Sequence, residues 1–208
     1  MNISIIRRET FHLEPLVQLF TATHKANGYP VEGPPRLELP ESWPEFFASN
    51  DASAEVLGLV ACQLEASADD GRMYHEPVGS IAGQVVTADS PSAVLGHVSV
   101  RRLPENSIVP RLWGDSAGNE GCADDMWEVC RLAVDPISQG KGIGWRLLQA
   151  VETYAHAKGK TLVLGVLEKD ANAIQMYEKR GWRRFGQDKM IGQDGREWEE
   201  YFYVCPRQ

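Results

Sequence analysis

Three observations in the amino-acid sequence predict a single mixed α/β domain over residues 1–208. The chain has 208 residues, of which 43% are hydrophobic. A chain of this size buries about 70% of its unfolded surface, so it can build a core without disulfides or a metal. Segments with strand and helix patterns alternate in the C-terminal half, which is typical of mixed α/β folds. No repeat or linker divides the sequence.

The elements of the N-terminal half follow from short apolar runs and from proline. Pro30, Pro34, Pro35 and Pro40 make residues 28–40 a loop. Residues 103–125 carry no clear pattern and are expected to be irregular. The apolar runs predict strands over 3–6, 55–64 and 93–100, a helix over 13–22, a possible short helix over 41–49 and a possible strand over 80–87. Their pairing does not follow from the sequence.

The C-terminal half has clearer signals. Asp170 stands where a helix N-cap is expected, and Gly159 and Gly181 stand where helices end. Gln193-Asp194-Gly195 predicts a turn between the last two strands. The apolar spacing predicts a strand over 127–134, a glycine-rich turn over 138–144, a helix over 145–158, a strand over 161–167, a helix over 170–180, and strands over 182–186 and 197–204.

Charge and cysteine content narrow the function classes. The chain has 21 Lys and Arg against 29 Asp and Glu, a net charge of −8, which argues against nucleic-acid binding. The four cysteines are scattered without metal-ligand spacing, so neither a metal site nor a disulfide framework is expected. The N-terminus does not have the pattern of a signal peptide, and no apolar run reaches about 18 residues. We therefore expect a cytoplasmic protein without a membrane span.

The glycine-rich turn is the strongest local signal for a ligand. Residues 139–144 read Gln-Gly-Lys-Gly-Ile-Gly between a predicted strand and a helix. The glycines allow positive φ and close approach, and the helix start presents N–H groups that favour an anion such as phosphate. Lys141 and Arg146 add positive charge. Pro136 rules out a Walker A loop, and Trp145 breaks the dinucleotide fingerprint. A connector that binds nothing is the alternative.

The stretch from Trp127 to Trp182 resembles the GNAT superfamily of acetyl-CoA-dependent N-acetyltransferases. Gln139, Gly142 and Gly144 match the family loop Gln/Arg-x-x-Gly-x-Gly/Ala, and the preceding strand EVCRLAVDP is similar to the family's. DANAIQMYEKRGW resembles the second family motif, although Asp170 occupies the usual Asn slot. The N-terminal segment ISIIRRET, followed by a predicted helix, is also similar to the usual start of the family's domain. The resemblance implies a mostly antiparallel central sheet flanked by helices, with a splayed central strand pair.

The resemblance also implies acetyl-CoA as cosubstrate. Its pyrophosphate would lie on the N–H groups of residues 139–144, and its pantetheine arm would pair with residues 132–134. An ionised Asp170 cannot donate the hydrogen bond that an Asn would. The implied cofactor contacts are Leu132, Ala133, Val134, Gln139, Gly140, Lys141, Gly142, Ile143, Gly144, Trp145 and Asp170.

The implied chemistry is direct attack of a primary amine on a thioester in a ternary complex. An amine of pKa about 10.4 must lose a proton, at a cost of about 4 kcal/mol near neutral pH. Glu128 is the candidate base, with a solvent-facing strand residue as the alternative. Tyr177 is the candidate donor to the leaving thiolate, with a core aromatic as the alternative.

The remaining polar residues are expected to play lesser roles. His97 is interpreted as a core histidine, Cys130 as a buried apolar residue and Tyr154 as part of a helix core. The acidic run from Asp115 to Glu128 is either a solvated loop or a rim that attracts amines. The acceptor, a small molecule or a peptide, is not identified, and a homodimer through the closing strands is plausible. The competing function is a CoA-binding sensor or interaction module without catalysis.

Overall fold

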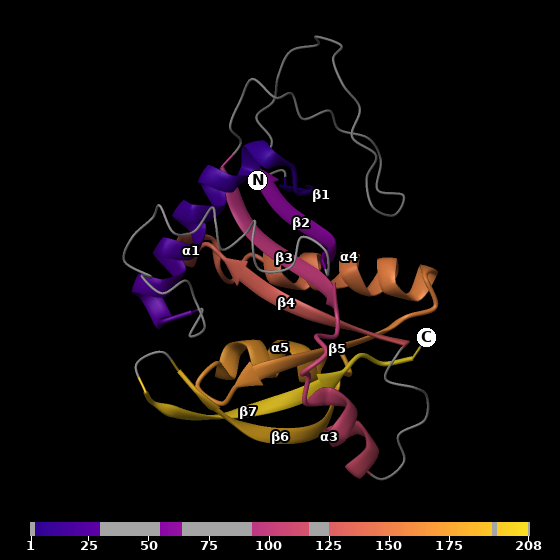
Figure 1. The fold of residues 1–208 in the computed structure, drawn as a ribbon. Coiled ribbons are helices and arrows are strands. Elements are labelled where there is room, and N and C mark those ends of the chain that lie inside the picture. Colours follow the sequence, from indigo (N-terminus) through magenta and orange to yellow (C-terminus); the bar gives the residue numbers. More distant parts are fainter. Residues whose placement is uncertain (1–2, 30–54, 64–92, 117–124, 193–194, 208) are drawn as a thin grey trace.

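The computed structural model describes residues 3–29, 55–63, 93–116, 125–192 and 195–207. The expected helix over 41–49 and strand over 80–87 lie outside these residues, as do residues 30–40 of the loop expected over 28–40. The described part forms one mixed α/β arrangement (Figure 1).

The strands build one seven-stranded sheet in the order β1-β2-β3-β4-β5-β7-β6. Every neighbouring pair is antiparallel except β4 and β5, which run parallel. The predicted mixed, mostly antiparallel sheet is therefore confirmed. The strands are β1 (Ile3–Arg7), β2 (Glu55–Gln63), β3 (Val94–Arg102), β4 (Met126–Val134), β5 (Thr161–Leu167), β6 (Arg183–Ile191) and β7 (Glu197–Val204).

Helices cover both faces of the sheet. Along β2, Leu59 packs in the cluster of α4 whereas Val60 packs with α1, because successive side chains of a strand point to opposite faces. Along β5, Leu164 packs in the core cluster that contains residues of α4 and α5, whereas Val163 packs in the cluster that contains residues of α3. The helices are α1 (Leu13–Asn27), α3 (Val109–Asp115), α4 (Ile143–Ala157) and α5 (Ala171–Lys179).

The parallel strands β4 and β5 separate after a short contact. Only Met126–Glu128 of β4 pair with Thr161–Val163 of β5. Beyond that point β4 continues beside β3 and β5 continues beside β7. A register shift opposite β3 places Arg131 at a φ of +54°, which marks a β-bulge in β4. The splayed central pair is thus confirmed, and the glycine-rich turn and α5 begin at its wide end.

Several element boundaries differ from the sequence predictions. Helix α1 runs to Asn27 rather than to residue 22, and it ends before Gly28, which has a φ of +72°. The segment expected to be irregular over 103–125 contains the seven-residue helix α3, which is too short to show a helical period and includes Pro110 and Gly114. Helix α4 begins at Ile143 rather than at residue 145. Strand β6 extends to Ile191 rather than 186, because its polar second half still pairs with β7.

Candidate active site

The glycine-rich turn has the geometry of an anion site. Gly140 and Gly142 both have φ near +76°, with no other atom within 4 Å of the place where a Cβ would stand. Gly142 immediately precedes α4 and supplies no side-chain cap. Within the described residues, the N–H groups of Gly142, Ile143 and Gly144 have no hydrogen-bond acceptor. These free donors at a helix start fit a diphosphate group.

The side chains around this turn have separate tasks. The Gln139 amide donates to the carbonyl of Val134 over 3.2 Å, which fixes the turn to the end of β4. The Arg146 guanidinium donates to the Ile3 carbonyl over 2.7 Å, so it anchors α4 to β1. Arg146 was expected to add charge beside the turn, and it is bound elsewhere. Trp145 is 41% exposed, with the Arg180 guanidinium 4.3 Å from its ring centre.

After Glu128, the side of β4 that faces β5 has no paired strand among the described residues. The predicted contacts at residues 132–134 lie on this stretch, where Ala133 pairs with His97 and Val134 pairs with Gly96 of β3. An unpaired strand edge binds extended chains that carry amides, by main-chain hydrogen bonds. The edge therefore suits an arm with peptide-like groups.

Glu128 lies at the narrow end of the splay and is held by an arginine. The Arg101 Nε donates to Glu128 Oε2 over 2.7 Å, and the two residues are direct neighbours on β3 and β4. The side chain of Glu128 is 18% exposed, so it is not the freely solvated strand residue that was its alternative. The ion pair uses one carboxylate oxygen and fixes the carboxylate in place.

Tyr177 lies on α5, buried against aromatic rings. Its ring centre is 5.9 Å from that of Trp182 and 6.2 Å from that of Tyr203. Burial raises the pKa of Tyr177 above its ordinary value, and the nearby negative charge of Asp170 raises it further. Tyr177 is therefore both a packed aromatic and a phenol that keeps its proton at neutral pH.

Asp170 stands at the predicted N-cap position of α5, but its side chain makes no capping hydrogen bond. It forms an ion pair with Lys169 instead, with 3.0 Å between Nζ and Oδ1. The predicted N-cap position is therefore confirmed, but the predicted capping hydrogen bond is absent, because Lys169 pairs with the carboxylate.

Tyr29, just after α1, is a site residue that the sequence reasoning missed. Burial raises its pKa, and Tyr177, Cys130 and Asp170 add to the effect. Its ring stacks on Phe20 of α1 with 6.3 Å between ring centres, and the charges that act on it come from β4 and from α5 and its N-cap. Its backbone N–H donates to Asn27 Oδ1 over 3.0 Å, and Lys169 donates to the Asn27 carbonyl over 3.2 Å. Tyr29 follows a glycine in a proline-rich stretch, and no local pattern marks it.

The other candidates have structural or minor roles. His97 is fully buried with Nδ1 3.0 Å from the Arg131 carbonyl, and burial and Arg8 lower its pKa to about 3, which confirms a core histidine. Cys130 is only half-buried, so the prediction of a buried residue is wrong. Tyr154 is half-buried and stacks on Trp127 with 6.0 Å between ring centres.

The acidic run is only partly described. Besides Glu128, which pairs with Arg101, it contains Asp125, whose Oδ1 lies 2.8 Å from Lys160 Nζ. Among the described residues no cluster of three or more His, Cys, Asp or Glu is placed to hold a metal ion. In the same part of the chain, no helix combines the length and apolar character needed to cross a bilayer.

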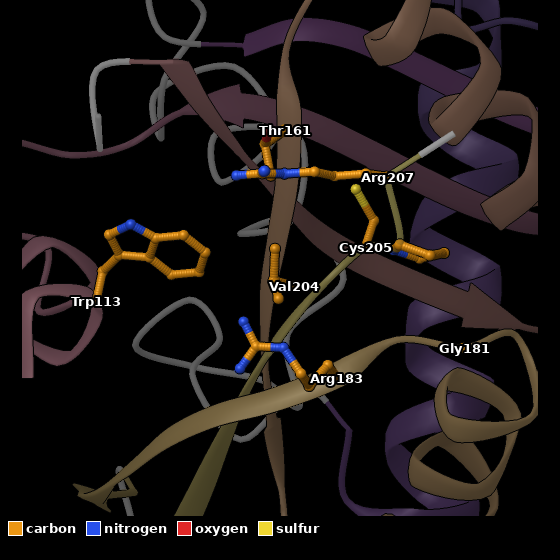
Figure 2. A pocket seen from close by; sticks show the side chains of 8 residues that line it. Trp113, Thr161, Gly181, Arg183, Val204, Cys205 and Arg207 are labelled. Atoms are coloured by element: carbon orange, nitrogen blue, oxygen red, sulfur yellow. The ribbon is translucent and has the colours of Figure 1, made fainter. Parts of the chain in front are cut away.

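A hollow of about 330 Å³ lies at the other end of the strands from the glycine-rich turn. It begins beside Thr161, the first residue of β5, whereas the turn follows the last residues of the parallel strand β4. Figure 2 shows Arg183 and Arg207 reaching into the space beside Val204. None of the predicted site residues lines it. Its walls are Trp113, Thr161, Gly181, Arg183, Val204, Cys205, Pro206 and Arg207.

Comparison of the structure with solved structures gives a consistent fold. An N-acetyltransferase from Staphylococcus aureus Mu50 aligns over 99% of this chain and 98% of its own, at 17% identity and a TM-score of 0.64. Arabidopsis thaliana NAA60 in complex with acetyl-CoA aligns over 98% and 97%, at 16% identity and 0.62. The ribosomal-protein-S18-alanine N-acetyltransferase from Escherichia coli aligns over 99% and 94%, at 18% identity and 0.61. At these identities the similarity establishes the fold.

Comparison with curated protein sequences finds no match. The family model described as "Acetyltransferase (GNAT) family" matches residues 40–182. This range is more than half of the chain, and it contains the splayed strands, the glycine-rich turn and α5. The chain therefore belongs to the GNAT acetyltransferase family.

Proposed function

We propose that this protein is an N-acetyltransferase that moves an acetyl group from acetyl-CoA to a primary amine of a small molecule or peptide. The observation that carries the proposal is the splay between β4 and β5. Among the described residues, it has N–H groups without an acceptor at one end and Glu128 at the other, and α5, which carries Tyr177, begins at its wide end. Membership of an acetyltransferase family, and a fold neighbour in complex with acetyl-CoA, support the same reading.

The proposed cofactor contacts divide by chemistry. The pyrophosphate would accept hydrogen bonds from N–H groups of Gln139, Gly140, Lys141, Gly142, Ile143 and Gly144, with Trp145 adjoining. The pantetheine amides would pair with Leu132, Ala133 and Val134 on the free edge of β4. Asp170, held by Lys169, adjoins this arm without donating to it. Bound acetyl-CoA supplies the activated acyl group, and no metal is proposed.

Glu128 and Tyr177 would handle the protons. The Glu128 oxygen outside the Arg101 pair would accept the amine's proton, directly or through a water. Tyr177 would donate a hydrogen bond to the sulfur as it leaves, which its raised pKa favours because the phenol stays protonated. The amine nitrogen would bond to the acyl carbon while the carbon–sulfur bond breaks, with no acyl-enzyme.

The competing proposal is a CoA-binding sensor or interaction module that has lost catalysis. Asp170 in place of the family's Asn is the feature that favours it, because one cofactor contact changes. Glu128 and Tyr177 favour the enzyme. The proposal further takes the protein to be cytoplasmic and able to form a homodimer through its closing strands, with no nucleic-acid or membrane partner.

Release of CoA thiol, followed with a thiol reagent, separates the two proposals. An acetyltransferase releases CoA from acetyl-CoA when a suitable primary amine from a panel is added, and the acetylated amine appears in equal amount. A sensor gives a thermal shift with acetyl-CoA and no turnover with any amine. The second result would refute acetyl transfer.

A further inference from the structure

Glu200 on β7 reaches over a glycine at the splay. Its side chain lies above Gly165 of β5, so that a Cβ at Gly165 would overlap Glu200 Oε1 and stand 2.9 Å from its Cδ. Real Cβ atoms do not approach other atoms this closely. The carboxylate can therefore take this position only because residue 165 has no side chain.

The strand register places Glu200 and Glu128 on the same face of the sheet. Val163 and Phe202 pack on the α3 face, and Gly165 and Glu200 are each two residues from one of them, so they share that face. Glu128 pairs with Val163 and faces the same way. Gly165 is about 7 Å further along β5, where β4 has already separated. The two carboxylates thus flank the opening from opposite sides.

The surroundings of the Glu200 carboxylate favour a cation. Glu200 and Gly165 are both half-buried, and the next atom near the glycine is Phe202 Cε1, at 3.3 Å from the same Cβ position. A carboxylate set against an aromatic floor is less well hydrated than one in open solvent, and it interacts more strongly with a positive charge. On the other side of the opening, Arg101 already occupies one oxygen of Glu128.

We propose that Glu200 is a specificity residue that binds the protonated amine of the acceptor and directs it toward Glu128. The acceptor is accordingly an amine that is cationic at neutral pH, such as an alkylamine. This inference rests on the proposed acetyl transfer. The ammonium is hydrogen-bonded by Glu200 on arrival, and the proton leaves toward Glu128 before the nitrogen attacks.

The test compares two acceptors with Glu200→Gln, which keeps the size of the side chain and removes its charge. One acceptor is a protonated alkylamine, and the other is an O-alkylhydroxylamine that is neutral at pH 7.4. We expect KM for the alkylamine to rise about tenfold or more, because a charge-assisted hydrogen bond is lost. KM for the neutral acceptor and for acetyl-CoA should stay within about twofold of wild type.

Two further variants sharpen the test. Glu199→Gln is the matched control, since Glu199 lies on the other face of β7 and accepts a hydrogen bond from Gln187 at the surface over 3.5 Å. In this variant, KM for the alkylamine, for the neutral acceptor and for acetyl-CoA should stay at the wild-type values. Gly165→Ala leaves Glu200 in the chain but pushes its carboxylate out of position. It should raise KM for the alkylamine and not for the neutral acceptor, even if Glu200→Gln fails to fold. Equal KM changes for both acceptors, or none, would overturn the role of Glu200 alone. No turnover by wild type with any amine of the panel from which the two acceptors are taken would overturn the acetyl transfer itself, and this role with it.

Discussion

Arg101 donates from its Nε to Glu128 Oε2 over 2.7 Å, across two neighbouring strands at the point where β4 and β5 part. Both side chains are largely covered, at 26% and 18% exposure. Covered ion pairs with one defined geometry fix a carboxylate more firmly than exposed pairs do. Arg101 is therefore a positioning residue for the proposed base.

Replacing Glu128 by Gln removes the proposed proton acceptor. We expect kcat to fall by about a hundredfold or more at neutral pH, and the pH optimum to move upward, because an amine that is already deprotonated needs no base. The pH dependence of thiol release measures both effects. A pH profile that coincides with wild type would exclude Glu128 as the base.

Replacing Tyr177 by Phe keeps the packing and removes the phenol. We expect lower kcat with an unchanged affinity for acetyl-CoA, since the hydrogen bond to sulfur forms as the thiolate leaves. In wild type the raised pKa of Tyr177 means that activity should not fall at pH 9 to 10 through ionisation of this phenol. Calorimetric binding and steady-state rates provide the comparison, and an unaltered kcat would contradict the role.

Asp170→Asn restores the residue type usual in the family and removes a negative charge near Tyr177. Burial, the main cause of the raised pKa of Tyr177, stays in this variant, but the charge that adds to it is gone, so this pKa should fall part of the way toward its ordinary value. The ultraviolet titration of tyrosinate reports the shift, with Tyr177→Phe identifying the signal. If the titration curve does not move, Asp170 does not act on this phenol.

Gly142→Ala tests the anion site with a matched control. Gly142 and Gly28 have φ of +76° and +72°, and both have open space where a Cβ would stand. Alanine at either position should cost about 1 kcal/mol of unfolding free energy through backbone strain. Only Gly142→Ala should also weaken acetyl-CoA binding, measured by calorimetry. Equal affinities in the two variants would show that the turn does not hold the cofactor.

Buried His97 predicts a loss of stability in acid. Its pKa in the folded state is about 3, against 6.5 ordinarily, so below pH 6.5 the unfolded chain binds a proton that the folded chain excludes. The unfolding free energy should therefore fall by about 1.4 kcal/mol per pH unit from this residue as pH drops below 6.5. Urea unfolding at pH 7, 6 and 5 measures the slope, which should be shallower in His97→Gln. An imidazole signal of His97 titrating near pH 6.5 in the folded protein would contradict this.

The C-terminal half was predictable because each of its elements carries its own local signal. The apolar stripe of α4 and the glycines that follow α4 and α5 mark helices without knowledge of the fold. The glycine-rich turn is defined by residue types that admit positive φ, and the structure gives Gly140 and Gly142 that conformation.

Tyr29 and Glu200 could not be found in the same way, because their significance depends on pairing between distant segments. Glu200 matters only because Gly165 lies beside it, and the register that joins β5 to β7 is not written in either segment alone. The bonding of Asp170 was missed for a related reason. Lys169 competes with the helix N-terminus, and sequence position does not decide between them.

The early parting of β4 and β5 gives the protein a receptor that is assembled before any ligand arrives. Three residues on each strand join them, and beyond Glu128 no described residue of β5 pairs with β4. Under the proposed function, a thioester carrier entering this slot would complete the hydrogen-bond ladder instead of breaking one. No strand has to unpair for the ligand to bind. The conformational entropy of the slot is therefore lost on folding and not on binding.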